Sequence, residues 1–239
     1  MDSWEYESAR DRQVDNKARR QSPQREPGLF GAMVSLAWWV LVRTYLKFYH
    51  RLSVNGGESM PQDPGFVMVA NHASHLDVLC LAASLPLRWN GHVYPIAAGD
   101  TFFEKPTAAF FATYCLNALP LWRRKASGHT LTELRERLCQ GDQVLLIFPE
   151  GTRSRDGVMG SFKPGIGRIV AGTETLVLPV HIDGAHRAYP PKATFPRPHG
   201  IRLTIGEPIS FEGVEDTRDG WREIGERLEA CVRSLRKDE

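Results

Sequence analysis

The sequence has almost no excess of charge of either sign. Its 30 lysines and arginines stand against 28 aspartates and glutamates, a formal net charge of +2. A balance so close to neutral carries no general attraction to nucleic acid, so we expect no nucleic-acid partner. The chain is also poor in cysteine, and the few present lack the paired spacing of a metal site or a disulfide framework. They predict reduced, structural thiols in a cytosol-facing domain and no bound metal. These cysteines are Cys80, Cys115, Cys139 and Cys231.

The N-terminal region lacks a hydrophobic run of transmembrane length. Its uncharged apolar stretch covers residues 29–42 and would form a helix about 21 Å long. A bilayer core requires roughly 20 apolar residues, so this stretch is too short to span one comfortably. The residues before it are polar and charged, which predicts no secretory signal and a flexible polar tail over residues 1–27.

Residues 28–51 predict a helical segment that lies in the membrane interface. The helical pattern continues past residue 42, where Arg43, Lys47 and Arg51 are spaced at i, i+4 and i+8 and form a basic stripe. Aromatic residues lie among them. Such a helix can place its apolar side toward acyl chains and its cations toward anionic headgroups. A buried core helix with one solvated edge is the alternative interpretation.

Residues 52–239 form the predicted catalytic domain, in which strand-like and helix-like stretches alternate. This alternation predicts an α/β fold with a central, mostly parallel or mixed sheet flanked by helices. The expected strands cover residues 66–70, 92–97, 143–148, 176–182 and 200–205, and the expected helices cover residues 77–84, 107–117, 127–140 and 218–236.

A polar cluster at residues 71–77 follows the first buried strand of this domain and contains His72 and Asp77. Inside one regular helix, five positions would turn these two side chains about 140° apart. If His72 lies instead on the strand-to-helix turn, the Asp77 carboxylate can reach its ring, fix the tautomer and support a general base. The alternative is structural, because Ser74 and Asp77 also have the spacing of a helix capping box.

A second polar cluster follows the strand expected at residues 143–148. Its glycine allows close backbone approach to a ligand, and its hydroxyl and guanidinium groups suit a phosphate. Its glutamate can orient an arginine or bind a substrate hydroxyl. A surface turn with solvated arginines is the alternative. The candidate binding residues are Glu150, Gly151, Thr152 and Arg153, with Ser154 and Arg155 beyond them.

The two clusters together resemble the glycerolipid acyltransferase family typified by 1-acylglycerol-3-phosphate acyltransferase. That family carries Asn-His-x-x-x-x-Asp and Phe-Pro-Glu-Gly-Thr-Arg-Ser, and both motifs stand here unaltered at residues 71–77 and 148–154. The stretch from residue 98 to 124 resembles its second motif, with Arg123 as the phosphate-binding arginine. This stretch has Gly-Asp where many members have Lys-x-Glu, which leaves the acceptor headgroup open. Residues 178–180 resemble the fourth motif, and residues 162–165 the segment before it.

The resemblance implies transfer of a fatty acyl group from acyl-CoA or acyl carrier protein to the hydroxyl of a lysolipid, first of all 1-acylglycerol-3-phosphate. In that reaction His72 deprotonates the acceptor hydroxyl and Asp77 holds His72. Arg153, with Arg123 and Gly151, holds the acceptor phosphate. No cofactor is implied. We expect the protein at the cytoplasmic face of the inner or cell membrane, in contact with anionic lipids.

Other functions stay open from the sequence. The same base can activate water, which would make the protein an acyl-thioesterase. A membrane-binding module without catalysis would use only the N-terminal helix and basic patches. Within acyl transfer, another lysophospholipid or a lyso-aminolipid can be the acceptor.

Overall fold

A seven-stranded sheet forms the centre of the protein in the computed structural model, which describes residues 29–98, 115–121, 128–139 and 141–236. The strand order is β1-β7-β6-β2-β5-β3-β4. The strands are β1 (Ser53–Asn55), β2 (Phe66–Ala70), β3 (Val93–Ala98), β4 (Leu119–Leu121), β5 (Val144–Ile147), β6 (Leu176–Asp183) and β7 (Arg202–Ile205). All neighbours pair in parallel except β6 and β7, so the predicted mostly parallel sheet is confirmed.

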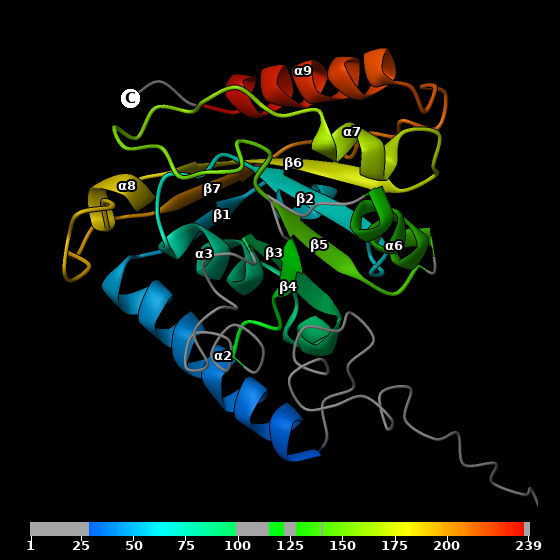
Figure 1. The fold of residues 1–239 in the computed structure, drawn as a ribbon. Coiled ribbons are helices and arrows are strands. Elements are labelled where there is room, and N and C mark those ends of the chain that lie inside the picture. Colours follow the sequence, from blue (N-terminus) through cyan, green and yellow to red (C-terminus); the bar gives the residue numbers. More distant parts are fainter. Residues whose placement is uncertain (1–28, 99–114, 122–127, 140, 237–239) are drawn as a thin grey trace, which may run out of the picture.

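Helices cover both faces of the sheet (Figure 1). The face with α9 (Arg218–Ser234) also carries α7 (Gly165–Val170) and α6 (Gly128–Cys139). The opposite face carries α3 (Leu76–Ser84), the 3-10 helix η2 (Leu87–His92) and α2 (Leu29–Tyr49). The remaining short helices are η1 (Gly57–Ser59) and α8 (Ala185–Ala188).

The central strand β2 shows why both faces require cover. Its side chains alternate between the two faces, as the period of a strand requires. Phe66, Met68 and Ala70 join the core under α2 and α3, whereas Val67 and Val69 join the core under α7 and α9. Because every residue of β2 is buried, the strand reads as one continuous apolar run in the sequence.

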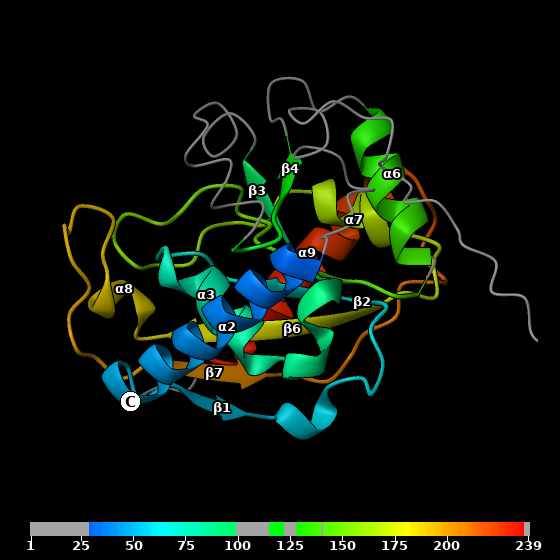
Figure 2. The same ribbon diagram turned by 90° about the horizontal axis from the view of Figure 1, so that it is seen from below.

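Helix α2 lies outside α3 and η2 on one side of the molecule (Figure 2). Trp39, Val42 and Leu46 are buried against them, at the spacing of one helix face. In the described parts of the chain we find no helix with the length and apolar character needed to cross a membrane. The membrane-interface role predicted for residues 28–51 stays a prediction.

The prediction that Arg43 belongs to an outward-facing basic stripe on α2 is wrong. Its guanidinium Nη2 donates to the carbonyl of Leu85, which caps the end of α3, and burial lowers the pKa of the side chain. The carbonyls at a helix C-terminus attract a cation, so Arg43 joins two helices instead of facing outward. Lys47 and Arg51 are exposed.

Helix α7 was not predicted, because the sequence there carries proline and glycine, which are typical of loops, at Pro164, Gly165 and Gly167. Gly167 is required for packing: a Cβ at this position would lie 2.4 Å from Cα of Trp221 on α9. The short edge strands β1 and β4 also escaped prediction. The helix expected at residues 107–117 lies outside the described residues up to 114, and residues 115–117 are not helical.

Candidate active site

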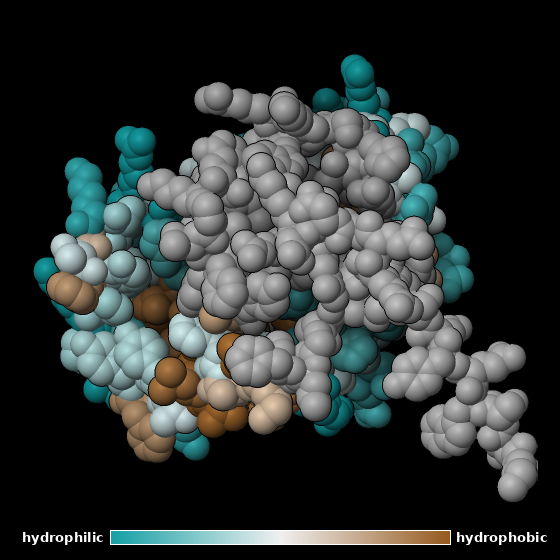
Figure 3. Space-filling model, turned by 60° about the horizontal axis from the view of Figure 1, so that its bottom comes forward, coloured by the Kyte–Doolittle hydropathy of each residue, from teal (hydrophilic) through white to brown (hydrophobic). Residues whose placement is uncertain are grey.

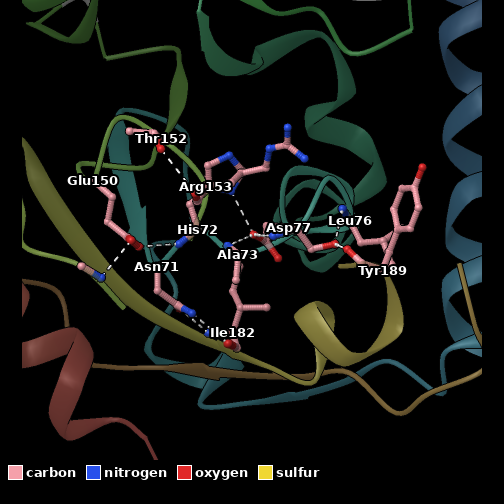
Figure 4. Close-up of polar contacts among 12 residues, drawn as sticks. Asn71, His72, Ala73, Leu76, Asp77, Glu150, Thr152, Arg153, Ile182 and Tyr189 are labelled. Carbon is pink, nitrogen blue, oxygen red and sulfur yellow. Dashed lines mark hydrogen bonds and ion pairs between the residues drawn. The ribbon is translucent and has the colours of Figure 1, made fainter. Parts of the chain in front are cut away.

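The first polar cluster has the arrangement that the five-residue spacing requires. Strand β2 ends at Ala70, helix α3 begins at Leu76, and His72 lies on the turn between them. Asp77 lies in the first turn of α3 and is fully buried. Its Oδ2 is 2.9 Å from Nδ1 of His72. The two side chains therefore meet although they are close in sequence (Figure 4).

Asp77 also closes the start of the helix. The same Oδ2 accepts the backbone N–H groups of Ala73 and Ser74, each at 2.7 Å. The capping role and the contact with His72 are thus combined in one oxygen. The other oxygen, Oδ1, is buried without a hydrogen-bond partner among the described residues. Three donors on one side of the carboxylate hold it in a single orientation.

His72 is fixed in both tautomer and ring orientation. A carboxylate only accepts hydrogen bonds, so Nδ1 carries the proton that it donates to Asp77 and Nε2 has a free lone pair. The ring stacks on Phe148, with centroids 4.1 Å apart and an interplanar angle of 20°. Its side chain is 18% exposed, which leaves the imidazole accessible from one side.

The second polar cluster forms hydrogen bonds with the backbone of His72. The His72 N–H donates to Oε1 of Glu150 at 2.7 Å, and the His72 carbonyl accepts the N–H of Ser154 at 2.8 Å. The second oxygen of Glu150 accepts the N–H of Gly160 at 2.9 Å. Both oxygens of this buried glutamate therefore bind backbone groups, so Glu150 positions His72 and the following loop. Burial raises the pKa of Glu150, against the opposing effect of the two N–H donors.

The other candidate residues of this cluster lie at its exposed end. Gly151 has a φ of +70°, a conformation that favours glycine. Thr152 donates its hydroxyl to the Arg153 carbonyl at 3.3 Å. Arg153 is half-buried, and its Nη1 is buried without a hydrogen-bond partner among the described residues. Partial burial and then the positive charge of Arg153 lower the pKa of His75. Arg153 therefore places a cation beside the first cluster.

Two residues of the first cluster have positioning roles that the sequence did not reveal. The Asn71 amide donates to the Ile182 carbonyl at 2.9 Å and accepts the Ile182 N–H at 2.8 Å. Ser74 donates its hydroxyl to the carbonyl of Tyr189 at 2.9 Å. These three bonds fasten the turn that carries His72 to β6 and to the segment beyond it. Polar residues directly after a fully buried strand are the only sequence signal for these roles.

Arg123 and most of the stretch from residue 98 to 124 lie outside the described residues. Within the described part of the chain, no group of three or more histidine, cysteine, aspartate or glutamate side chains is arranged to hold a metal ion. The site thus consists of a buried carboxylate, an oriented imidazole with one free nitrogen and a nearby guanidinium. This set of groups can remove a proton from a hydroxyl and attract an anion.

The two clusters lie at the carboxyl ends of parallel strands, where α/β enzymes have their active sites. Comparison of the chain with known proteins identifies its family. The family model named Acyltransferase matches residues 51–183, more than half of the chain. The chain therefore belongs to the acyltransferase family.

Its relatives include a chloroplastic 1-acyl-sn-glycerol-3-phosphate acyltransferase of Arabidopsis thaliana, 31% identical over 72% of this chain and 46% of that protein. The alpha form of the same enzyme from Ovis aries is 25% identical over 73% of this chain and 60% of that protein. The chain thus spans about half the length of these curated relatives. The crystal structure of the 1-acyl-sn-glycerophosphate acyltransferase PlsC from Thermotoga maritima matches with a TM-score of 0.65 and 27% identity, over 87% of this chain and 81% of that chain.

Proposed function

We propose that this protein transfers a fatty acyl group from a thioester donor to the hydroxyl of a lysolipid, with 1-acylglycerol-3-phosphate as the first candidate acceptor and phosphatidic acid as its product. The observation that carries the proposal is the contact of 2.9 Å between Nδ1 of His72 and Oδ2 of Asp77. The relatives named for this reaction support the choice of acceptor. The donor is acyl-CoA or an acyl carrier protein.

In the proposed reaction Nε2 of His72 accepts the proton of the acceptor hydroxyl. The hydroxyl oxygen then attacks the thioester carbonyl, the new ester bond forms and the carbon–sulfur bond breaks. The departing thiolate takes the proton back from the imidazolium. Asp77 stabilises the imidazolium while it exists and keeps the ring in one orientation. Glu150, Ser154 and Phe148 hold His72 in place, so little reorganisation is required during the reaction.

The acceptor's phosphate group is the natural partner of Arg153. A guanidinium binds phosphate oxygens through paired N–H donors. Two observations support this role for Arg153. Its buried Nη1 has no hydrogen-bond partner among the described residues, and its charge lies near the first cluster. The assignment of Arg123, Gly151 and Thr152 to the same group remains part of the proposal.

A lipid-acceptor panel with one acyl-CoA tests the proposed function. Thiol release and lipid products are measured with 1-acylglycerol-3-phosphate, other lysophospholipids, a lyso-aminolipid and monoacylglycerol, and then without any acceptor. The proposal expects acceptor-dependent thiol release that is fastest with 1-acylglycerol-3-phosphate. Equal thiol release without acceptor would identify a thioesterase instead. Transfer only to acceptors without phosphate would refute the role of Arg153. The same panel with acyl carrier protein compares the donors.

We also propose that α2 rests on a membrane surface. Its outward side chains are apolar, with Phe48 75%, Met33 63% and Leu41 62% exposed. Figure 3 shows hydrophobic residues gathered on the face over α2. Lys47 and Arg51 flank these residues with positive charge, which suits anionic headgroups. We place this surface at the cytoplasmic face, where the lipid substrates would enter.

A further inference from the structure

The glycine of the second cluster is in contact with a lysine from a different part of the chain. A Cβ built on Gly151 would lie 2.7 Å from Nζ of Lys163 and 3.4 Å from its Cδ and Cε. The lysine side chain therefore extends along the glycine, over the space that any other residue would fill. The end of a flexible lysine can move aside, so it is the φ of +70° that favours glycine at position 151, and the contact shows only where the Lys163 ammonium lies.

The backbone of Lys163 is fixed at this place. Its N–H donates to the Pro149 carbonyl at 3.0 Å, directly before Glu150 in the second cluster. The preceding Phe162 donates its N–H to Oε2 of Glu229 on α9 at 2.9 Å. Glu229 is in turn bound by Arg233 at 2.7 Å. Helix α9 thus sets the position from which the Lys163 side chain extends to Gly151.

The ammonium group has no acidic partner among the described residues. No ion pair within 4.0 Å joins it to a carboxylate there. The acidic residue of the second cluster, Glu150, has both oxygens engaged by backbone N–H groups. The Lys163 side chain is exposed, and its ammonium lies beside Gly151, two residues before Arg153, without a carboxylate partner among the described residues. A cation in this position is suited to bind an anion.

We propose that Lys163 binds a phosphate group of a substrate, together with Arg153. This inference rests on the proposed function, because it supplies a second cation for the same reaction. A phosphate monoester carries up to two negative charges near neutral pH, more than one guanidinium compensates. The phosphate can be that of the acceptor lipid or one of those on a coenzyme A donor, and kinetics distinguish the two.

The test compares Lys163→Met and Lys163→Arg with the wild type and with a matched control, Lys192→Met, which removes an exposed lysine in the segment after α8. KM for 1-acylglycerol-3-phosphate and KM for acyl-CoA are measured separately. We expect Lys163→Met to raise one of them by about tenfold or more, the loss of one charge-assisted hydrogen bond. Lys163→Arg should stay within a few-fold of the wild type, and Lys192→Met should match it.

A raised acceptor KM assigns Lys163 to the lipid phosphate, and a raised acyl-CoA KM assigns it to the donor. Unchanged KM values for both substrates in an active Lys163→Met enzyme would overturn the inference and leave the proposed function standing. If the wild type transfers no acyl group to any lysolipid, the proposed function fails instead. The inference is then decided by thermal stabilisation with glycerol 3-phosphate, which Lys163→Met should weaken and which an equal shift in both proteins would contradict.

Discussion

His72 donates its backbone N–H to the side chain of Glu150 at 2.7 Å, although 78 positions separate the two residues. The carbonyl of His72 is bound by the N–H of Ser154, so one peptide segment is held on both sides by the second cluster. The glutamate of the Phe-Pro-Glu-Gly-Thr-Arg segment thus positions His72, the proposed base, through the backbone. This relationship makes the two motifs one structural unit, and it has consequences for stability.

Glu150→Gln is expected to lower the free energy of unfolding by about 1–3 kcal/mol, because a glutamine can accept only one of the two backbone N–H groups and turns its own NH₂ toward the other. Urea denaturation measures the change. Glu223→Gln, at an exposed position on α9, is the control and should stay within about 0.5 kcal/mol of the wild type. Equal stability of the two variants would contradict the positioning role of Glu150.

The effect of Glu150→Gln on the free energy of unfolding should also depend on pH. Burial raises the pKa of Glu150 above its ordinary value of 4.5, so the folded protein binds this proton more tightly than the unfolded chain. The stability that Glu150 contributes through this proton is present below pH 4.5 and is lost as the pH rises through the raised pKa. A protonated carboxyl group still offers one oxygen to each of the two N–H groups, which an amide NH₂ does not, so the stability difference between wild type and Glu150→Gln should be largest at low pH and shrink with rising pH. A difference that grows with pH would mean that the pKa is lowered instead.

Asn71→Ala is expected to destabilise the protein by about 2–4 kcal/mol, because it leaves the buried N–H and carbonyl of Ile182 without their side-chain partner. Asn71→Asp should not rescue the loss, since a carboxylate cannot donate to the Ile182 carbonyl. Thermal unfolding of both variants measures the effect. A change of less than about 0.5 kcal/mol in Asn71→Ala would show that β6 does not hold the turn before His72.

The membrane surface of α2 is tested by a pair of serine substitutions two positions apart. Phe48→Ser, at a side chain that is 75% exposed, should reduce sedimentation with anionic vesicles and leave the melting temperature unchanged. Leu46→Ser, at a fully buried side chain, should lower the melting temperature instead. Vesicle binding by Phe48→Ser equal to that of the wild type would argue against this surface.

The sequence predicted the sheet and the local geometry of the first cluster well. Strand β2 and helix α9 carry apolar patterns of the right period, and the five-residue spacing of His72 and Asp77 required a turn followed by a helix. These are local properties. A pattern of three or four residues decides them, so the chain reveals them without knowledge of its partners.

The contacts between distant segments could not be predicted in this way. Arg43 has the spacing of a basic stripe on a helix surface, yet its guanidinium is half-buried and donates to the carbonyl of Leu85. The sequence offers Glu150 as a substrate ligand and gives no sign that its carboxylate accepts the backbone N–H of His72. A glycine such as Gly167 is typical of loops, and the sequence does not show that Trp221 approaches it too closely for a larger residue. Each case depends on which elements pack together.

The central claim is that His72 acts as the general base, and the turnover of His72→Ala tests it most directly. In this variant Asp77 still accepts the backbone N–H groups of Ala73 and Ser74. The protein should therefore remain folded, with a circular dichroism spectrum similar to that of the wild type. Acyl transfer to 1-acylglycerol-3-phosphate at saturating substrate should fall by a factor of about 10²–10⁴. Turnover at the wild-type rate in the folded variant would contradict the account.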